Sequence, residues 1–262
     1  DVYKRQAVSG VKAKDQDRVE TVTYRKDAQK AVIRYVSTNG NRVLTTDEVT
    51  GKSGEAIAYS TTSQINEFKK QGYKLVSDEF TAGGAKVYDY DTARDQVYTV
   101  TLSERVEPVN PDNPTPQPNT PVNPGQPDSP RWPGTVENLD NKESVSRTIH
   151  YVYEDGSKAK DDVVETLQFK RWSNVNLVTG HIDFQDWTTN DDTFDKVVSP
   201  TIAGYTADKS EIPAVSGVQA KDQDRVETVT YRKDAQKAII RYVSTNGCLL
   251  YTSPSPRDVE ES

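Results

Sequence analysis

The sequence predicts an α+β chain that is mainly β, divided into two small domains by a proline-rich segment. Thr, Val and Tyr are abundant, and the short apolar runs alternate with polar residues, as half-buried strands do. Ten of the 14 prolines lie between Pro108 and Pro133. Only 33% of the 262 residues are hydrophobic, which favours small cores and exposed connecting segments over one large core.

The first domain is expected over residues 30–107. AVIRYVSTNGNRVLTT predicts a hairpin in which alternate residues from Ala31 to Tyr35 share a buried face and Asn39-Gly40 forms the turn. GYKLV and DQVYTVTL predict two further strands, the last with inward positions from Tyr98 to Leu102. Because the first and last strands alternate most strongly, we expect them to pair with each other.

A short helix is expected between these strands, in TTSQINEFKKQG. Ile65 and Phe68 would lie on one face of it, which can pack against the sheet. Ser63 is the candidate N-cap, and Gly72 can end the helix in a left-handed conformation.

Residues 108–137 are expected to form a linker. A proline every two or three residues holds the backbone near polyproline II and prevents it from forming a sheet ladder. Such a spacer would reach about 80 Å if fully extended, at roughly 3.1 Å per residue. Trp132 is expected to pack the linker against a domain.

The second domain is expected over residues 138–233. RTIHYVYEDGSKA predicts a strand and a turn, with Ile149, Tyr151 and Tyr153 on one face. VETLQFKRW and VNLVTGHIDFQDW predict further strands with a turn at Thr179-Gly180, and GYTAD and DRVETVTY close the domain. Extra β-structure takes the place of the helix. Both domains then follow the order of hairpin, crossing segment, Gly-Tyr strand and final strand, which suits a β-grasp fold.

A long repeat brackets the two domains. Ala7–Gly40 aligns with Ala214–Gly247, a shift of 207 residues (214 − 7), and only two aligned positions differ. The match indicates a tandem array whose unit contains both domain types and the linker. Residues 7–29 would then end a preceding second-type domain, and residues 234–247 would begin the next first-type domain.

The two ends of the chain look foreign to this array. DVYKRQ is the translation of a transposon-end adapter used in sequencing libraries, and CLLYTSPSPRD is a translation of its reverse complement. We therefore expect residues 1–6 and 248–262 to be adapter-derived and leave them out of fold reasoning. The single cysteine, Cys248, falls in the second segment, so the rest offers no disulfide, thiolate catalyst or cysteine metal site.

Charge and hydropathy exclude two further classes of function. The net charge of −7 argues against nucleic-acid binding, which needs a clustered basic surface. No apolar run approaches the length that spans a membrane, so we expect no membrane insertion of this fragment.

Several stretches resemble a known family. RTIHYVYEDGSKAKDDVVETLQF, SPTIAGYTADKSEIP and VETVTY resemble the second domain of bacterial mucus-binding (Mub) repeats. QKAVIRYV, TGKSGEAIAYST, QGYKLVSDEF and YDYDTARDQVYTVTL resemble the first, a mucin-binding protein (MucBP) domain, and together the stretches cover nearly all of residues 7–247. The resemblance implies β-grasp-like domains in wall-anchored adhesins on the surface of Gram-positive gut bacteria. These bind mucin glycoproteins, and some repeats are associated with immunoglobulin binding.

A mixed aromatic and polar stretch is the candidate sugar site, because sugar sites combine an aromatic face with groups that reach hydroxyls. Trp172 occupies a position at which the Mub repeats that this sequence resembles carry a small polar residue. The candidate residues are Trp172, Asn174, Asn176, Gln185, Asp186, Trp187 and Asn190. The competing interpretation, which we favour, makes Trp187 a core residue and Trp172 a partly buried edge residue.

Other chemical motifs are weak. DYDTARDQ and TTNDDTFD cluster carboxylates that could hold calcium, but neither has the glycine or terminal glutamate of an EF-hand loop. Solvated acidic loops are therefore preferred, with Asp191 and Asp192 as the weak metal candidates and no other cofactor expected. TGKSG lacks the first glycine of a phosphate-binding loop. His150 is expected on the outer face of a strand, without a nucleophile motif nearby.

The sequence thus predicts a non-enzymatic, extracellular adhesin repeat that binds host mucin glycans weakly, with many copies raising avidity. Two alternatives stay open. The repeats could serve only as a structural stalk, or they could bind immunoglobulin or another protein through an exposed sheet edge.

Overall fold

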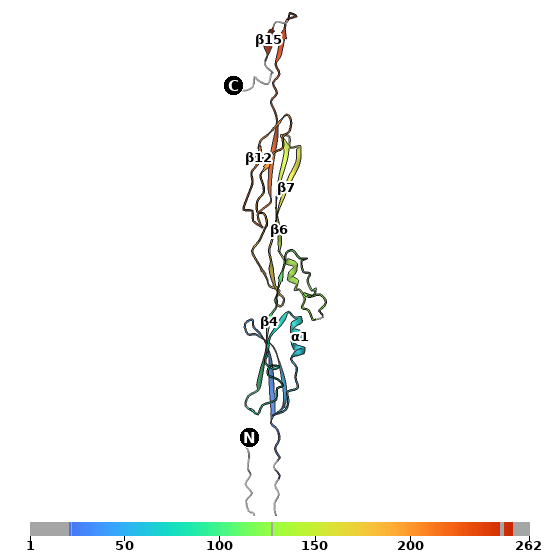
Figure 1. The fold of residues 1–262 in the computed structure, drawn as a ribbon, viewed down its shortest axis with the longest axis vertical. Coiled ribbons are helices and arrows are strands. Elements are labelled where there is room, and N and C mark those ends of the chain that lie inside the picture. The colour runs from blue at the N-terminus through green and yellow to red at the C-terminus, as the bar shows by residue number, and fades with distance from the viewer. Residues whose placement is uncertain (1–20, 22, 127, 247–248, 254–262) are drawn as a thin grey trace, which may run out of the picture. The chain divides into compact units, whose positions relative to one another are not determined.

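The computed structural model describes residue 21 and residues 23–126, 128–246 and 249–253. The chain divides into two compact units, unit 1 (Asp1–Arg105) and unit 2 (Val106–Ser262), whose elements are labelled in Figure 1. The adapter-derived segment expected at residues 1–6 lies outside the described residues, as do residues 7–20, Cys248 and residues 254–262.

Unit 1 is a four-stranded mixed sheet with one α-helix among its described residues. The strands are β1 (Ala28–Ser37), β2 (Val43–Lys52), β3 (Tyr73–Asp78) and β4 (Gln96–Glu104), in the order β2-β1-β4-β3. β1 and β2 form an antiparallel hairpin, β1 and β4 run parallel, and β3 is antiparallel to β4. The expected pairing of the first and last strands is confirmed.

The β1–β2 hairpin turns near Asn39-Gly40, as predicted. Gly40 (φ 67°) and Asn41 (φ 52°) both have the left-handed backbone that glycine adopts freely and asparagine tolerates. Ala31, Ile33 and Tyr35 of β1 are all 0% exposed, which confirms the predicted inward face.

Helix α1 (Thr62–Lys70) packs its apolar face into the core of unit 1. Ile65 and Phe68 are buried, as the pattern predicted. The Phe68 ring lies 5.7 Å from that of Tyr35 and 5.6 Å from that of Tyr73, measured between centroids. These contacts tie the helix to β1 and β3 together.

The ends of α1 match the prediction at one terminus only. Gly72 (φ 95°) follows the last turn, as predicted. Ser63 as the N-cap is wrong, because the helix begins after Thr61. The Thr61 hydroxyl donates to Asp78 Oδ2 over 2.6 Å instead of capping the helix, so α1 has no side-chain cap.

Unit 2 repeats the strand scheme of unit 1. Its main sheet contains β6 (Lys142–Tyr153), β7 (Lys158–Lys170), β11 (Tyr205–Ala207) and β13 (Arg225–Lys233), in the order β11-β13-β6-β7. β6 and β7 form an antiparallel hairpin, β6 and β13 run parallel, and β11 is antiparallel to β13. The final strand thus again pairs with the first.

The remaining elements of unit 2 are mostly short strands, as expected in place of a helix. They are β5 (Val106–Val109), β8 (Ser173–Asn176), β9 (Ile182–Phe184), β10 (Val197–Val198) and β12 (Glu211–Ile212), with one 3-10 helix, η1 (Gly134–Asn138). β5, β8 and β9 form a second sheet, and β10 pairs with β12. Near the end of the chain, β14 (Ile240–Val243) pairs with β15 (Leu249–Ser253). The predicted turn at Thr179-Gly180 is present, with Gly180 at φ 74°.

The strand tyrosines lie in or beside the cores, as predicted, but their hydroxyl groups differ. The Tyr35 and Tyr59 hydroxyls are 2.9 Å apart, and burial raises the pKa of both phenols. The Tyr231 hydroxyl donates to the Pro200 carbonyl over 2.5 Å. The Tyr151 hydroxyl, by contrast, is buried without a partner among the described residues.

Arg147 is buried among the inward-facing residues of β6. It is 1% exposed and alternates with Val145 and Ile149, which are both 0% exposed. Its guanidinium donates to Glu165 over 2.7 Å and to the carbonyls of Pro213 and Asp195. These partners compensate the buried charge and fasten two irregular segments to the sheet.

The proline-rich segment is not the extended spacer that its composition predicted. Pro108 lies within β5 and pairs with Asn174 of β8, so the expectation that it cannot join a ladder is wrong. β5 is an edge strand, where a missing N–H is tolerated. The division between the two compact units falls after Arg105, so the proline-rich segment belongs to unit 2.

An apolar cluster holds this segment against the rest of unit 2. Val136 is 0% exposed and packs with Val109, Val175 and Leu177. Trp132 packs against the same cluster, which confirms its predicted role. The apolar residues between the prolines supply contacts that an extended spacer would leave in water.

No helix among the described residues is both long and apolar enough to cross a membrane.

Candidate functional site

β7 presents a row of polar side chains to solvent. Leu167 and Phe169 are buried in the core of unit 2. Thr166, Gln168 and Lys170 alternate with them and are exposed. β7 is also an edge strand of its sheet, so its outer edge is free to bond to segments outside the sheet.

The row forms one wall of an open groove of about 530 Å³. Trp172 follows β7, residues 188–191 form a second wall, and the proline-rich segment contributes a third. We call this hollow the Trp172 groove. It is lined by Pro111, Asp112, Thr166, Leu167, Gln168, Lys170, Trp172, Thr188, Thr189, Asn190 and Asp191.

The Trp172 side chain is 42% exposed, although its backbone is fixed. The Trp172 carbonyl accepts a hydrogen bond from the backbone N–H of Gln185 over 2.9 Å. The ring therefore offers a large, stiff apolar surface that loses little conformational entropy on binding a ligand.

The wall formed by residues 188–191 is held by hydrogen bonds to β7. Thr188 and Lys170 exchange two backbone hydrogen bonds of 2.7 and 2.8 Å. The Thr189 hydroxyl lies 2.8 Å from the Gln168 carbonyl and 2.7 Å from the Asp191 carbonyl. These contacts keep the polar side chains of the wall at the rim of the groove.

An ion pair joins the third wall to β7. Lys170 Nζ lies 2.5 Å from Asp112 Oδ1, and this hydrogen bond holds the pKa of the Asp112 carboxyl below its usual range. Pro111 is buried beside it. The proline-rich segment is thus pinned where it borders the groove.

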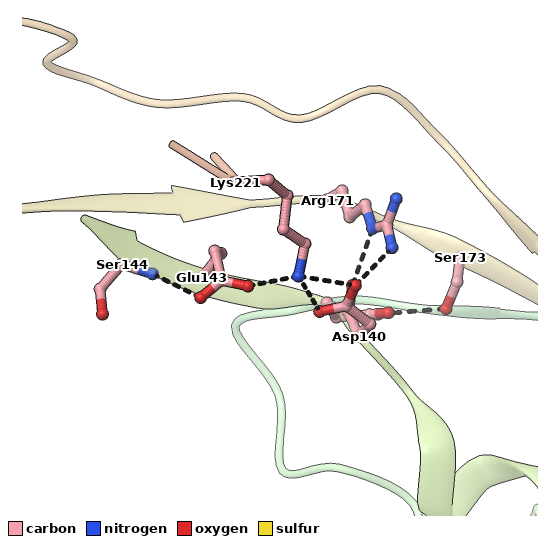
Figure 2. A network of polar contacts seen from close by, with 7 residues as sticks. Asp140, Glu143, Ser144, Arg171, Ser173 and Lys221 are labelled. Atoms are coloured by element: carbon pink, nitrogen blue, oxygen red, sulfur yellow. Dashed lines mark hydrogen bonds and ion pairs between the residues drawn. The ribbon is translucent and has the colours of Figure 1, made fainter. Parts of the chain in front are cut away.

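Arg171, between Lys170 and Trp172 in the chain, packs on two aromatic rings. Its guanidinium lies 4.0 Å from the centroid of the Phe184 ring and 4.3 Å from that of Trp187. It also donates to the Asp140 carbonyl over 2.7 Å and to Asp140 Oδ2 over 2.9 Å. Figure 2 shows this pair within a larger polar network.

Lys221 completes the network in Figure 2. Its ammonium contacts the Asp140 carboxylate at 3.1 Å and the Glu143 carboxylate. The hydrogen bond between Lys221 and Glu143 raises the pKa of Lys221 and lowers that of Glu143. The network thereby ties the loop before β13 to the start of β6.

The structure brings together only some of the predicted site residues. Trp172, Asn190 and Asp191 line the groove. Trp187 is partly buried against the core, as the favoured interpretation expected. The predicted residues that do not line the groove are Asn174, Asn176, Gln185, Asp186 and Trp187.

Two of these other residues have structural roles. The Asn176 side-chain oxygen accepts from the backbone N–H groups of Val178 and Thr179 and so shapes the turn before β9. Asn174 lies in β8, paired with Pro108 on one side. A polar residue near a tryptophan in sequence is thus often used by the backbone of its own turn or sheet.

Sequence reasoning missed most of the groove. Thr166 and Gln168 could have been found, because they alternate with the apolar residues of β7 in VETLQFKRW. Pro111 and Asp112 could not, since nothing local indicates that the proline-rich segment folds back onto unit 2.

The weak metal candidates hold local hydrogen bonds. Asp191 Oδ1 accepts from the Thr193 N–H, and Asp192 Oδ1 accepts from the Thr193 hydroxyl. No group of three or more His, Cys, Asp or Glu in the described part of the chain could hold a metal ion. Calcium binding stays a prediction. His150 is part-exposed, with Nδ1 2.9 Å from Asp162 Oδ2.

Two known domain families match the two units. Residues 29–104 match the family described as "Mucin binding domain", and residues 136–235 match "Muc B2-like domain". A search of curated proteins gives no match.

Solved structures match over both units. The crystal structure of Mub-RV aligns with 26% identity and a TM-score of 0.62, over 79% of this chain and all of that one. The type 2 repeat of the mucus-binding protein MUB from Lactobacillus reuteri aligns with 28% identity and a TM-score of 0.51, over 79% of this chain and 100% of that chain. Because family models match both units and these solved repeats align over 79% of the chain, the chain belongs to the family of mucus-binding repeats.

Proposed function

We propose that this chain is an extracellular adhesin repeat that binds mucin glycans, and that unit 2 contacts them through the Trp172 groove. The family to which the chain belongs supports mucin as the partner. The part-exposed Trp172 ring, set among hydroxyl and amide side chains, is the observation that carries the assignment of the groove.

The chemistry of the groove suits a sugar. The apolar C–H face of a pyranose ring can stack on Trp172, while its hydroxyls can bond to Thr166, Gln168 and Asn190. Lys170 and Asp112 neutralise each other, and Asp191 leaves the lining with one net negative charge. A neutral sugar is therefore favoured over an anionic one.

Binding to immobilised mucin by the whole chain tests the assignment of the groove. Trp172→Ala removes the stacking surface and is expected to weaken binding about tenfold or more, as truncation of a central aromatic residue does. Trp172→Phe keeps a smaller ring, so its affinity for mucin is expected to lie between those of the wild type and Trp172→Ala. Val226→Ala alters an exposed side chain of β13 outside the groove and is the matched control.

Deglycosylated mucin and immunoglobulin separate the alternatives. Loss of binding on deglycosylation supports glycan recognition, and retained binding indicates a protein contact. Unchanged mucin binding by Trp172→Ala would move the contact out of the groove, for example into unit 1. If an array of repeats without the adapter-derived ends binds neither mucin nor immunoglobulin, the remaining alternative is that the repeats serve as a structural stalk.

We propose further that tandem copies bind multivalently and that each unit has a β-grasp fold. Weak single sites in tandem copies would raise avidity through effective concentration. The sheet orders β2-β1-β4-β3 and β7-β6-β13-β11, with parallel central pairs, support a β-grasp assignment for each unit.

A further inference from the structure

A small cavity lies next to the Trp172 groove. It has a volume of about 110 Å³, against about 530 Å³ for the groove, so it suits a substituent better than a sugar ring. Pro111 lines both hollows. Lys142, which lines the cavity, is also the β6 partner of Lys170, which lines the groove. The two hollows are therefore neighbours.

Asn141, which lines the cavity, carries a buried acceptor that no described protein group satisfies. Asn141 is 8% exposed, and its Oδ1 has no hydrogen-bond partner among the described residues. Its Nδ2 lies 3.1 Å from the Ser173 hydroxyl and 3.5 Å from the Val109 carbonyl. A carbonyl only accepts, so the amide nitrogen belongs on the Val109 side and the oxygen is left free.

An unsatisfied buried acceptor is costly, so a donor that reaches Asn141 Oδ1 gains more than it would at the surface. The rest of the lining is of two kinds. Val109, Pro111 and Leu139 are apolar, while the polar residues are Asn110, Asn113, Thr115 and Lys142, of which Asn113 and Lys142 can donate hydrogen bonds to an occupant. The occupant that matches this lining has a small apolar end, one N–H or O–H donor and one acceptor.

We propose that the cavity binds the acetamido group of an N-acetylated amino sugar whose ring lies in the Trp172 groove. This inference rests on the proposed function. The amide N–H donates to Asn141 Oδ1, and the methyl group contacts Val109, Pro111 and Leu139. The acetyl carbonyl accepts from Lys142. Unit 2 thereby distinguishes an N-acetylhexosamine from the parent hexose, which carries a hydroxyl at the same carbon.

The first test compares ligands on the unmodified chain by NMR titration. The probes are the methyl glycosides of N-acetylgalactosamine, N-acetylglucosamine, galactose and glucose. We expect each N-acetylated sugar to bind about fivefold or more tightly than its parent, the effect of one additional buried hydrogen bond. Equal affinities within both pairs would overturn the proposal, and so would binding of none of the four sugars.

The second test asks whether the preference for N-acetylated sugars depends on the cavity. Asn141→Leu removes the acceptor and is expected to abolish the preference for N-acetylated sugars while leaving the affinity for galactose and glucose within about twofold. If this variant does not fold, Leu139→Phe fills the cavity and serves the same purpose. A folded variant of either kind that keeps the full preference would overturn the proposal.

Trp172→Ala separates this inference from the proposed function, because it is expected to lower the affinity for all four sugars by the same factor. Binding that depends on Trp172 but shows no N-acetyl preference refutes the cavity assignment and leaves the groove intact. Binding that does not depend on Trp172 refutes the proposed function as well.

Discussion

Units 1 and 2 build the same sheet and fill its crossover differently. In both, the first strand pairs with its hairpin partner on one side and runs parallel to the last strand on the other. Unit 1 packs the helix α1 against this sheet. Unit 2 uses short strands and irregular chain, together with the buried Arg147.

The two kinds of crossover differ in where they leave room for a binding surface. A helix buries its apolar face through regular side-chain contacts and satisfies its own backbone. Irregular chain must instead be fastened by side chains such as Arg147 and by edge contacts such as those between Thr188 and Lys170. The Trp172 groove lies where these fastened segments meet the edge of the sheet.

A core substitution in α1 should cost unit 1 more stability than any other change considered. Phe68→Ala removes the ring that contacts Tyr35 and Tyr73 and is expected to destabilise unit 1 by about 3–5 kcal/mol. Urea unfolding followed separately in the two units would measure it. Asn66→Ala, on the same helix but outside the buried set, is the control. A similar loss in unit 2 would contradict separate cores.

Arg147 tests the corresponding role in unit 2. Arg147→Ala strands Glu165 and two carbonyls without their donor and is expected to cost about 3 kcal/mol in unit 2 alone. Arg232→Ala breaks an exposed pair with Glu154 and is the matched control, with an expected cost below about 1 kcal/mol. Equal costs for both variants in urea titrations would show that burial of Arg147 is unimportant.

The proline-rich segment is a further feature of unit 2, where its apolar residues pack in a cluster with Val175 and Leu177. Val136→Ala opens a gap in that cluster and is expected to destabilise unit 2 by about 2 kcal/mol. Pro114→Ala, exposed in the same segment, should change little. Thermal unfolding checks both variants. If Val136→Ala has no effect on stability, the extended spacer predicted from the sequence would be the better description of this segment.

The smallest effect concerns the ion pairs around Lys221. The raised pKa of Lys221 gives a contribution that is complete below the ordinary lysine pKa and is lost as pH rises through the higher folded value. The lowered pKa of Glu143 gives one that is complete above the ordinary glutamate pKa and is lost as pH falls through the lower folded value.

The stability difference between the wild type and Lys221→Gln should therefore be constant between about pH 5 and pH 10 and shrink outside that range. Because these groups are exposed, it should also shrink in high salt. Melting temperatures across pH in low and high salt provide the measurement. A difference that grows below pH 5 would contradict the assignment.

Local pattern predicted most strands and the helix, because one buried face imposes a period on the sequence. Ile65 and Phe68 showed the helix, and Ala31, Ile33 and Tyr35 showed β1. The same pattern hid Arg147, since a charged residue at an inward position is assumed to face water.

The groove was predictable only in part. Trp172, Asn190 and Asp191 were found from composition, but the neighbours of Trp172 depend on contacts between distant segments. The fold-back of residues 108–137 depends on an apolar cluster completed by Val175 and Leu177, far along the chain. A proline-rich sequence predicts a stiff backbone, but it does not predict which residues the neighbouring valines will contact.

The parallel pairing of first and last strands has a mechanical consequence. Because β1 and β4 run in the same direction, the chain enters unit 1 at one end of the sheet and leaves at the other. A stretching force on the two ends therefore loads the β1–β4 hydrogen bonds in shear, so that they must break together instead of unzipping singly. β6 and β13 are also parallel in the main sheet of unit 2, so a force on the ends of these two strands loads their hydrogen bonds in shear as well. The parallel pair in each main sheet thus opposes extension of the chain by a pulling force.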